Sequence, residues 1–94
     1  MGKKSIVQKD ESRCFICGRT AGLERHHILG GPNRKWSEKY GLTVMLCGTD
    51  CHRGPKGVHS DRALGDRLKR LAQIAFEARY SHDEWMETFR KNYL

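Results

Sequence analysis

Apolar residues are spaced differently in the two halves of the chain. Residues 42–46 form a short continuous apolar run after Gly41, and such a run is typical of a buried strand. From residue 61 to residue 80, apolar residues recur at alternating steps of four and three, which predicts a helix with one apolar face. These residues are Leu64, Leu68, Leu71, Ala75 and Ala78. The spacing therefore predicts an α+β fold in which a long amphipathic helix follows a strand-containing part.

Shorter elements are expected before the apolar run. An apolar stretch near Leu23 and the following residues up to Leu29 are short enough to form a first strand. Residues 30–33 contain two glycines and a proline, so they predict a loop. Residues 34–40 can form a helical turn, with Asn33 as its cap. Two strands joined by this long connection would make a hairpin-like unit.

The two ends of the chain have different characters. Residues 1–12 are polar and lack periodicity, so we expect a flexible basic arm before a single domain over residues 13–94. In that domain, residues 13–60 would form a metal-binding core and residues 61–94 a helical segment. Residues 81–84 match the S-x-x-E capping box, which predicts a second, short helix. This helix would carry an aromatic stripe made of Trp85, Phe89 and Tyr93.

Four cysteines occur in two closely spaced pairs. They are Cys14, Cys17, Cys47 and Cys51. Four thiolates can close a tetrahedral zinc site, and a chain of 94 residues often depends on a metal ion or disulfides for stability. Two disulfides are the alternative, but the close spacing and the neighbouring histidines favour zinc in a reducing cytoplasm. His52 or His59 can take the place of one thiolate, which leaves one ligand open.

The composition narrows the possible partners. Eighteen Lys and Arg residues against eleven Asp and Glu residues give a formal net charge of +7. A basic surface attracts nucleic acid through its phosphates, although solubility alone can also explain the charge. No apolar run approaches the ~20 residues that span a membrane, so a membrane role is not expected.

The histidines provide the candidate reactive groups. Imidazole binds metal ions and titrates near neutral pH, so it can serve as a ligand or as a general base. His26 and His27 are adjacent, and on a strand their side chains would point to opposite faces. His52 directly follows Cys51, and His59 precedes the long helix. His82 lies in the capping box, and we expect it to be structural.

In these residues the chain resembles the HNH endonucleases of the ββα-metal fold. The matching pieces are Cys14/Cys17, then Arg25-His26-His27-Ile28, then Leu46-Cys47-Gly48-Thr49-Asp50-Cys51-His52. The wider pattern looks like small phage-encoded members, which are similar to the nuclease domain of RecA-dependent recombination-enhancement nucleases. The family's central Asn normally comes just before the second strand, where this chain has Tyr40-Gly41.

The resemblance implies a role for each matching residue. His26 and His52 would bind a catalytic divalent ion, Mg²⁺ or Mn²⁺, with His59 as a further candidate ligand. His27 would be the general base, and Asn33 is the nearest residue that could orient it. The four cysteines would hold a structural zinc ion. DNA phosphates would contact Arg25, Arg34, Lys35, Lys39, Arg53 and Lys56.

Together these features predict a metal-dependent DNA endonuclease of low sequence specificity. We expect it in the cytoplasm of a bacterial or phage-infected cell, where a recombinase filament or another phage or host protein could be its partner. A non-catalytic zinc module that binds DNA or protein is the alternative, but it leaves His26 and His27 without a purpose. A zinc-dependent deaminase would need an H-x-E or C-x-E signature beside a P-C-x-x-C pair, and that combination is absent from the chain.

Overall fold

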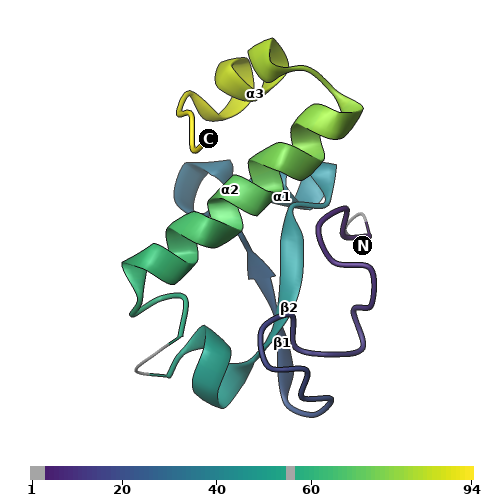
Figure 1. Ribbon diagram of the computed structural model, residues 1–94, viewed down its shortest axis with the longest axis vertical. Coiled ribbons are helices and arrows are strands. Elements are labelled where there is room, and N and C mark those ends of the chain that lie inside the picture. The colour runs from purple at the N-terminus through teal and green to yellow at the C-terminus, as the bar shows by residue number, and fades with distance from the viewer. Residues whose placement is uncertain (1–3, 55–56) are drawn as a thin grey trace.

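The protein has a small α+β fold, as the sequence predicts. The computed structural model describes residues 4–54 and 57–94 (Figure 1). In chain order its elements are β1 (Leu23–His27), η1 (Gly31–Asn33), α1 (Arg34–Tyr40), β2 (Thr43–Cys47), η2 (Gly48–His52), α2 (Arg62–Arg79) and α3 (His82–Phe89). The two strands form an antiparallel sheet, which α2 crosses in Figure 1, and α3 follows beyond the end of α2.

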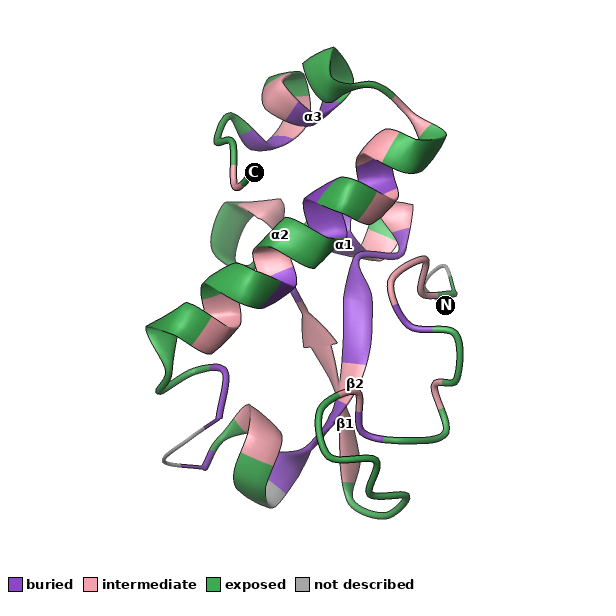
Figure 2. Cartoon of the chain, viewed as in Figure 1, coloured by how far each residue is buried: buried purple, intermediate pink, exposed green. Residues whose placement is uncertain are grey.

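The register of the sheet separates the neighbouring histidines. His26 pairs with Val44, and His27 pairs with Thr43. Side chains that are directly opposite each other in a sheet share a face, and successive side chains on a strand alternate. His26 therefore lies on the face of Val44, whereas His27 lies on the other face. Figure 2 shows that β2 is mostly buried, while β1 has intermediate exposure.

One buried serine of helix α1 forms two hydrogen bonds to the backbone just after β1. The Ser37 hydroxyl donates to the Leu29 carbonyl at 2.7 Å and accepts from the Leu29 N–H at 3.0 Å. Gly41 ends the helix at a φ of 71°, a conformation that favours glycine. Asn33 occupies the N-cap position, as the sequence predicts, but its side chain makes no capping hydrogen bond.

Helix α2 begins and ends near the predicted residues, but it buries a different face. Asp61 caps it by accepting from the Leu64 N–H at 3.1 Å. The buried side chains are those of Leu68, Ala72, Gln73 and Phe76. Leu71, which we placed on the apolar face, is 37% exposed, and Ala78 is exposed too. Phe76 lies four residues after Ala72 on the same side of the helix, and the burial of its large side chain makes this side face the core. No helix in the described part of the chain has the length and hydropathy needed to cross a membrane.

The buried polar residue Gln73 ties the C-terminal residues to α2. Its side-chain amide accepts from the Tyr93 N–H at 2.7 Å and donates to the side-chain oxygen Oδ1 of Asn92 at 2.8 Å. Helix α3 is capped by Ser81, as the capping box predicts. It stops at Phe89, so Tyr93 does not continue a helical stripe, although its ring still meets that of Trp85.

The N-terminal segment is not a free arm over residues 5–8. The Ser5 hydroxyl donates to the Thr43 carbonyl at 2.5 Å, and the Met45 N–H donates to the Gln8 side chain at 2.7 Å. A Cβ atom on Gly41 would overlap the Lys4 carbonyl oxygen, so this glycine also allows the segment to pass closely. The sequence did not reveal these contacts because they join residues far apart in the chain.

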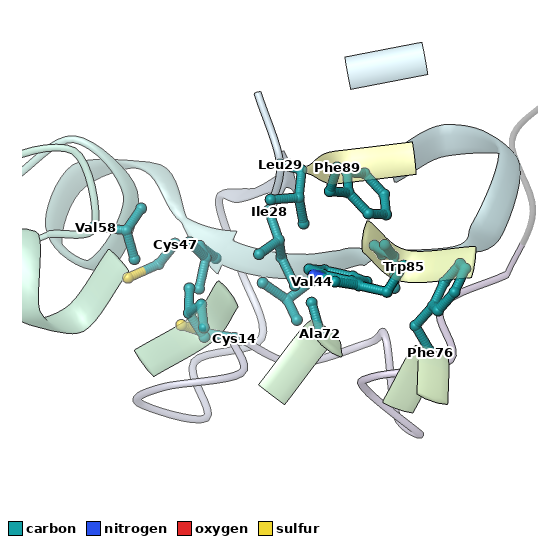
Figure 3. Packing of buried hydrophobic residues seen from close by; sticks show 13 residues of the cluster. Cys14, Ile28, Leu29, Val44, Cys47, Val58, Ala72, Phe76, Trp85 and Phe89 are labelled. Atoms are coloured by element: carbon teal, nitrogen blue, oxygen red, sulfur yellow. The ribbon is translucent and has the colours of Figure 1, made fainter. Parts of the chain in front are cut away.

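The core joins the sheet to α2 and α3. Figure 3 shows Val44, Ala72 and Trp85 packed close together, with Cys14 and Cys47 at the other end of the cluster. The Phe76 ring lies against Tyr40, Tyr80, Trp85 and Phe89, with centroid distances of 4.7 to 6.0 Å. One aromatic side chain therefore connects α1, α2 and α3.

Replacing Phe76 with alanine should lower the free energy of unfolding by about 3–5 kcal/mol, because it leaves a cavity where three helices meet. Leu71→Ala, on the exposed side of the same helix, should change it by only about 0.5 kcal/mol. Urea unfolding of the metal-loaded protein, followed by circular dichroism, measures both values. Equal losses for the two variants would show that the helix is packed by its other face.

Candidate metal centres and catalytic cleft

The four cysteines form one cluster that is near enough to bind a metal ion. Their sulfur atoms all lie within 4.8 Å of one another, and the Sγ atoms of Cys17 and Cys47 are 3.7 Å apart. Sulfur atoms that bind one zinc ion at about 2.3 Å in a tetrahedron lie about 3.8 Å apart. The cysteines are free rather than disulfide-bonded. The cluster therefore fits a structural zinc ion, and the histidines belong to a separate group.

Two tight turns bring the thiols together. In the first turn, the Gly18 N–H donates to the Cys14 carbonyl at 3.0 Å, and Gly18 has a φ of 77°. In the second, η2 is a π-helical turn in which the Arg53 N–H reaches the Gly48 carbonyl five residues earlier. A π-helical turn holds more residues than an α-helical turn. This turn explains how the wide spacing between Cys47 and Cys51 still brings both sulfurs to one point.

Backbone N–H groups favour thiolates in part of this cluster. Burial opposes ionisation of the Cys14 thiol, but the N–H groups around it lower its pKa to about 6. The Cys51 N–H lowers the pKa of Cys47. Burial and the neighbouring thiols raise the pKa of Cys51. Several thiolates so close together repel one another, and a bound divalent cation removes that repulsion.

Three histidines from separate elements form a second cluster. His26 comes from β1, His52 ends η2, and His59 precedes α2. One ring nitrogen from each lies within 4.8 Å of the other two, and the Nε2 atoms of His52 and His59 are 2.9 Å apart. Two nitrogens that bind one ion at about 2.1 Å are about 3.0 Å apart at an octahedral angle and about 3.4 Å apart at a tetrahedral one. The geometry therefore suits a shared metal ion and includes His59, which the sequence gave only as a further candidate.

Glu24, which sequence reasoning missed, holds one of these ligands in place. Its carboxylate accepts from His52 Nδ1 at 2.8 Å and from Arg53 Nη2 at 2.7 Å. A carboxylate can only accept, so Nδ1 carries the hydrogen and Nε2 keeps the lone pair for a metal ion. The His52 hydrogen bond and the Arg53 charge lower the pKa of Glu24. Glu24 lies two residues before His26 on a strand, and that shared face was the available signal.

Gly48 makes room for this carboxylate. A Cβ atom at this position would lie 2.7 Å from Cδ of Glu24, closer than real contacts allow. Glycine at position 48, at the start of η2, therefore leaves the space that the Glu24 side chain needs to reach His52.

The second cluster suits a transition-metal ion better than Mg²⁺. Burial and the neighbouring imidazoles lower the pKa of His26 to about 4, so its ring is neutral at neutral pH and can bind a cation. Imidazole nitrogens suit transition-metal ions, whereas Mg²⁺ prefers oxygen ligands. Of the two catalytic ions that the resemblance implies, Mn²⁺ thus fits this donor set better than Mg²⁺.

His27 opens into the same cleft as the three-histidine cluster. The cleft has a volume of about 290 Å³. Its lining comprises Arg25, His26, His27, Gly30, Gly31, Arg34, His52 and His59. An adjoining hollow adds Lys69 of α2, which the sequence did not single out because its place depends on how α2 packs. Although His26 and His27 point to opposite faces of the sheet, both reach this space beside β1.

The other predicted residues are divided between the cleft and other contacts. Arg34 lines the cleft, but Asn33 is not among its lining residues in the described part of the chain. Lys35 and Lys39 lie over the Trp36 ring at 5.0 and 5.4 Å. Lys56 lies outside the described residues.

Two predicted DNA contacts, and the histidine expected to be structural, are in ion pairs. Arg25 pairs with Glu38, and Arg53 pairs with Glu24. His82 contacts Glu77 at 2.8 Å, in keeping with a structural role.

Comparison with protein-family models, with curated proteins and with solved structures finds no match to this chain. The likeness to HNH endonucleases therefore depends on the sequence motifs alone, and the structure adds a cysteine cluster that is compatible with a zinc-stabilised fold.

Proposed function

We propose that this protein is an HNH-type DNA endonuclease that hydrolyses phosphodiester bonds with one divalent metal ion. The observation that supports this most is the convergence of His26, His52 and His59, with His27 in the same cleft. Three protein ligands leave positions open for a phosphate oxygen and water, as a catalytic metal site requires. A purely structural metal site would not need a further histidine beside it.

The positive charge around the cleft fits a phosphodiester substrate. Arg34 lines the cleft itself, and Lys69 lines the hollow beside His26 and His59. The whole chain carries a formal net charge of +7. Basic side chains hold the DNA backbone without reading its sequence, and no base-reading element is evident, so we expect low sequence specificity.

In the proposed reaction, His27 accepts a proton from a water molecule in the cleft. The water oxygen forms a bond to phosphorus, the bond from phosphorus to the 3′ oxygen breaks, and that oxygen takes a proton from solvent. Arg34 and Lys69 hold the phosphates on either side of the site. A divalent ion bound to the three histidines would supply positive charge for the phosphate and the leaving oxygen.

The likeness to phage proteins leads us to propose a partner protein and a cellular location as well. A recombination-enhancement nuclease acts together with a recombinase, so a recombinase filament or another phage or host protein could direct this chain to DNA. The expected location is the cytoplasm of a bacterial or phage-infected cell.

Cleavage of supercoiled plasmid tests the proposal. Protein dialysed free of loosely bound ions should nick the plasmid only after a divalent ion is added, with Mn²⁺ more effective than Mg²⁺. His52→Ala removes a metal ligand itself. It should therefore reduce the affinity for this ion by more than the ~10–100-fold loss that is typical when a residue hydrogen-bonded to a ligand is removed. His82→Ala, a histidine outside the cleft, is the matched control and should cleave like the parent. Cleavage that needs no added ion, or that survives His52→Ala unchanged, would contradict the proposal.

A further inference from the structure

The backbone of Glu38 is fixed beside the end of β1 by the buried residue that precedes it. Ser37 is fully buried and exchanges two hydrogen bonds with the backbone of Leu29, two residues after the end of β1. Buried hydrogen bonds of this kind fix the position of a short helix, because breaking them leaves polar groups unsatisfied. The backbone of α1 at Glu38 is therefore fixed relative to the end of β1.

Glu38 contacts the predicted general base directly. Its Oε2 atom lies 2.9 Å from His27 Nε2 and 3.2 Å from Arg25 Nη2. Arg25 and His27 are two residues apart on β1, so they share one face of the sheet, and both contact Glu38. A carboxylate has no hydrogen to donate, so the neutral His27 ring must carry its hydrogen on Nε2. The lone pair is then on Nδ1.

We propose that Glu38 is the positioning residue of His27, and that it makes Nδ1 the nitrogen that accepts the proton from water. This is the orienting task for which the sequence offered only Asn33, a residue outside the lining of the cleft. The contact adds little to stability, because Glu38 is partly exposed and such ion pairs are weak. The His27 side chain, however, is only 14% exposed. A fixed orientation of its ring therefore determines which atoms the unprotonated Nδ1 can contact. The catalytic part of this inference rests on the proposed function, whereas the position of the hydrogen does not.

The position of the hydrogen can be measured by nitrogen NMR of the histidine rings. At about pH 8, where an ordinary imidazole is neutral, His27 should show a protonated Nε2 and an unprotonated Nδ1. In Glu38→Ala this preference should weaken, while the signals of His82 stay unchanged. A His27 ring with its hydrogen on Nδ1 in the parent protein would overturn the inference, whether or not the protein cleaves DNA.

Kinetics of plasmid cleavage test the positioning role. Glu38→Ala should lower kcat about 10–100-fold, as expected when a catalytic group is misplaced, and leave KM unchanged. Glu38→Gln should recover much of the rate, since its amide oxygen can still accept from Nε2. Glu87→Ala, which removes one negative charge on the exposed side of α3, controls for net charge and should match the parent.

The outcomes separate this inference from the proposed function. If the parent cleaves and Glu38→Ala cleaves as fast or faster, Glu38 does not position the base, and the inference fails while the proposed function stands. If the parent does not cleave with any divalent ion, the proposed function fails, and the NMR measurement still decides the role of Glu38.

Discussion

Replacing Cys47 with serine should leave the chain without zinc and unfolded at room temperature. Cys47 is buried at the end of β2, opposite Leu23, and it belongs both to the cysteine cluster and to the hydrophobic core. Structural zinc sites bind with about 10–16 kcal/mol, and that free energy is also folding free energy. A domain has a free energy of unfolding of only about 5–15 kcal/mol. Losing the free energy of zinc binding should therefore make the folded state unstable.

Elemental analysis and circular dichroism measure this result together. The parent should contain one zinc ion per chain, and the Cys47→Ser variant should contain none and lose its helical signal. Ile16→Ser is a suitable control, because this exposed residue lies in the Cys14–Cys17 turn and carries no thiol. A folded Cys47→Ser variant without zinc would show that the cysteine cluster is not a structural metal site.

Replacing His27 with alanine should lower the rate of DNA cleavage by about 10²–10⁴-fold, the usual contribution of a general base. The loss should be confined to the chemical step. His27 is outside the three-histidine cluster, so divalent-ion binding should persist. DNA binding should persist too, since it depends on the basic residues around the cleft.

The comparison with His26→Ala makes this prediction specific. His26→Ala should weaken binding of the divalent ion, and excess Mn²⁺ should restore part of its activity, whereas added ion should not rescue His27→Ala. Isothermal titration with Mn²⁺ and cleavage assays at several ion concentrations measure the difference. Rescue of both variants by excess ion would make His27 a ligand rather than a base.

The sequence predicted those elements that local signals determine. Asp61 and Ser81 cap α2 and α3, and Gly41 ends α1 in a left-handed conformation. Each of these features depends on side-chain or backbone chemistry within one turn of the helix, which residue types alone reveal. The cysteine pairs were recognisable for the same reason, since each pair lies within one short turn.

The residues that the sequence missed are placed by contacts between distant segments. Glu24 reaches His52 across 28 positions, and Lys69 meets the histidine cluster only because α2 turns one particular side toward the sheet. Glu38 is a charged residue in a short amphipathic turn, where an exposed position is the ordinary expectation. Hydrophobic spacing gave no reason to prefer Phe76 over Leu71 as the inward side of α2, because both sets of positions fit a helical repeat.

The N-terminal residues beside β2 have a consequence for the behaviour of the protein in concentrated solution. A two-stranded sheet has two outer edges, and an uncovered strand can pair with a strand from another molecule. On the β2 side, the Met45 N–H donates to the Gln8 side chain, and the Met45 carbonyl accepts from the Phe15 N–H. The Thr43 carbonyl accepts from the Ser5 hydroxyl. With residues of its own N-terminal segment, the chain thereby shields its most apolar strand from pairing with a strand of another molecule.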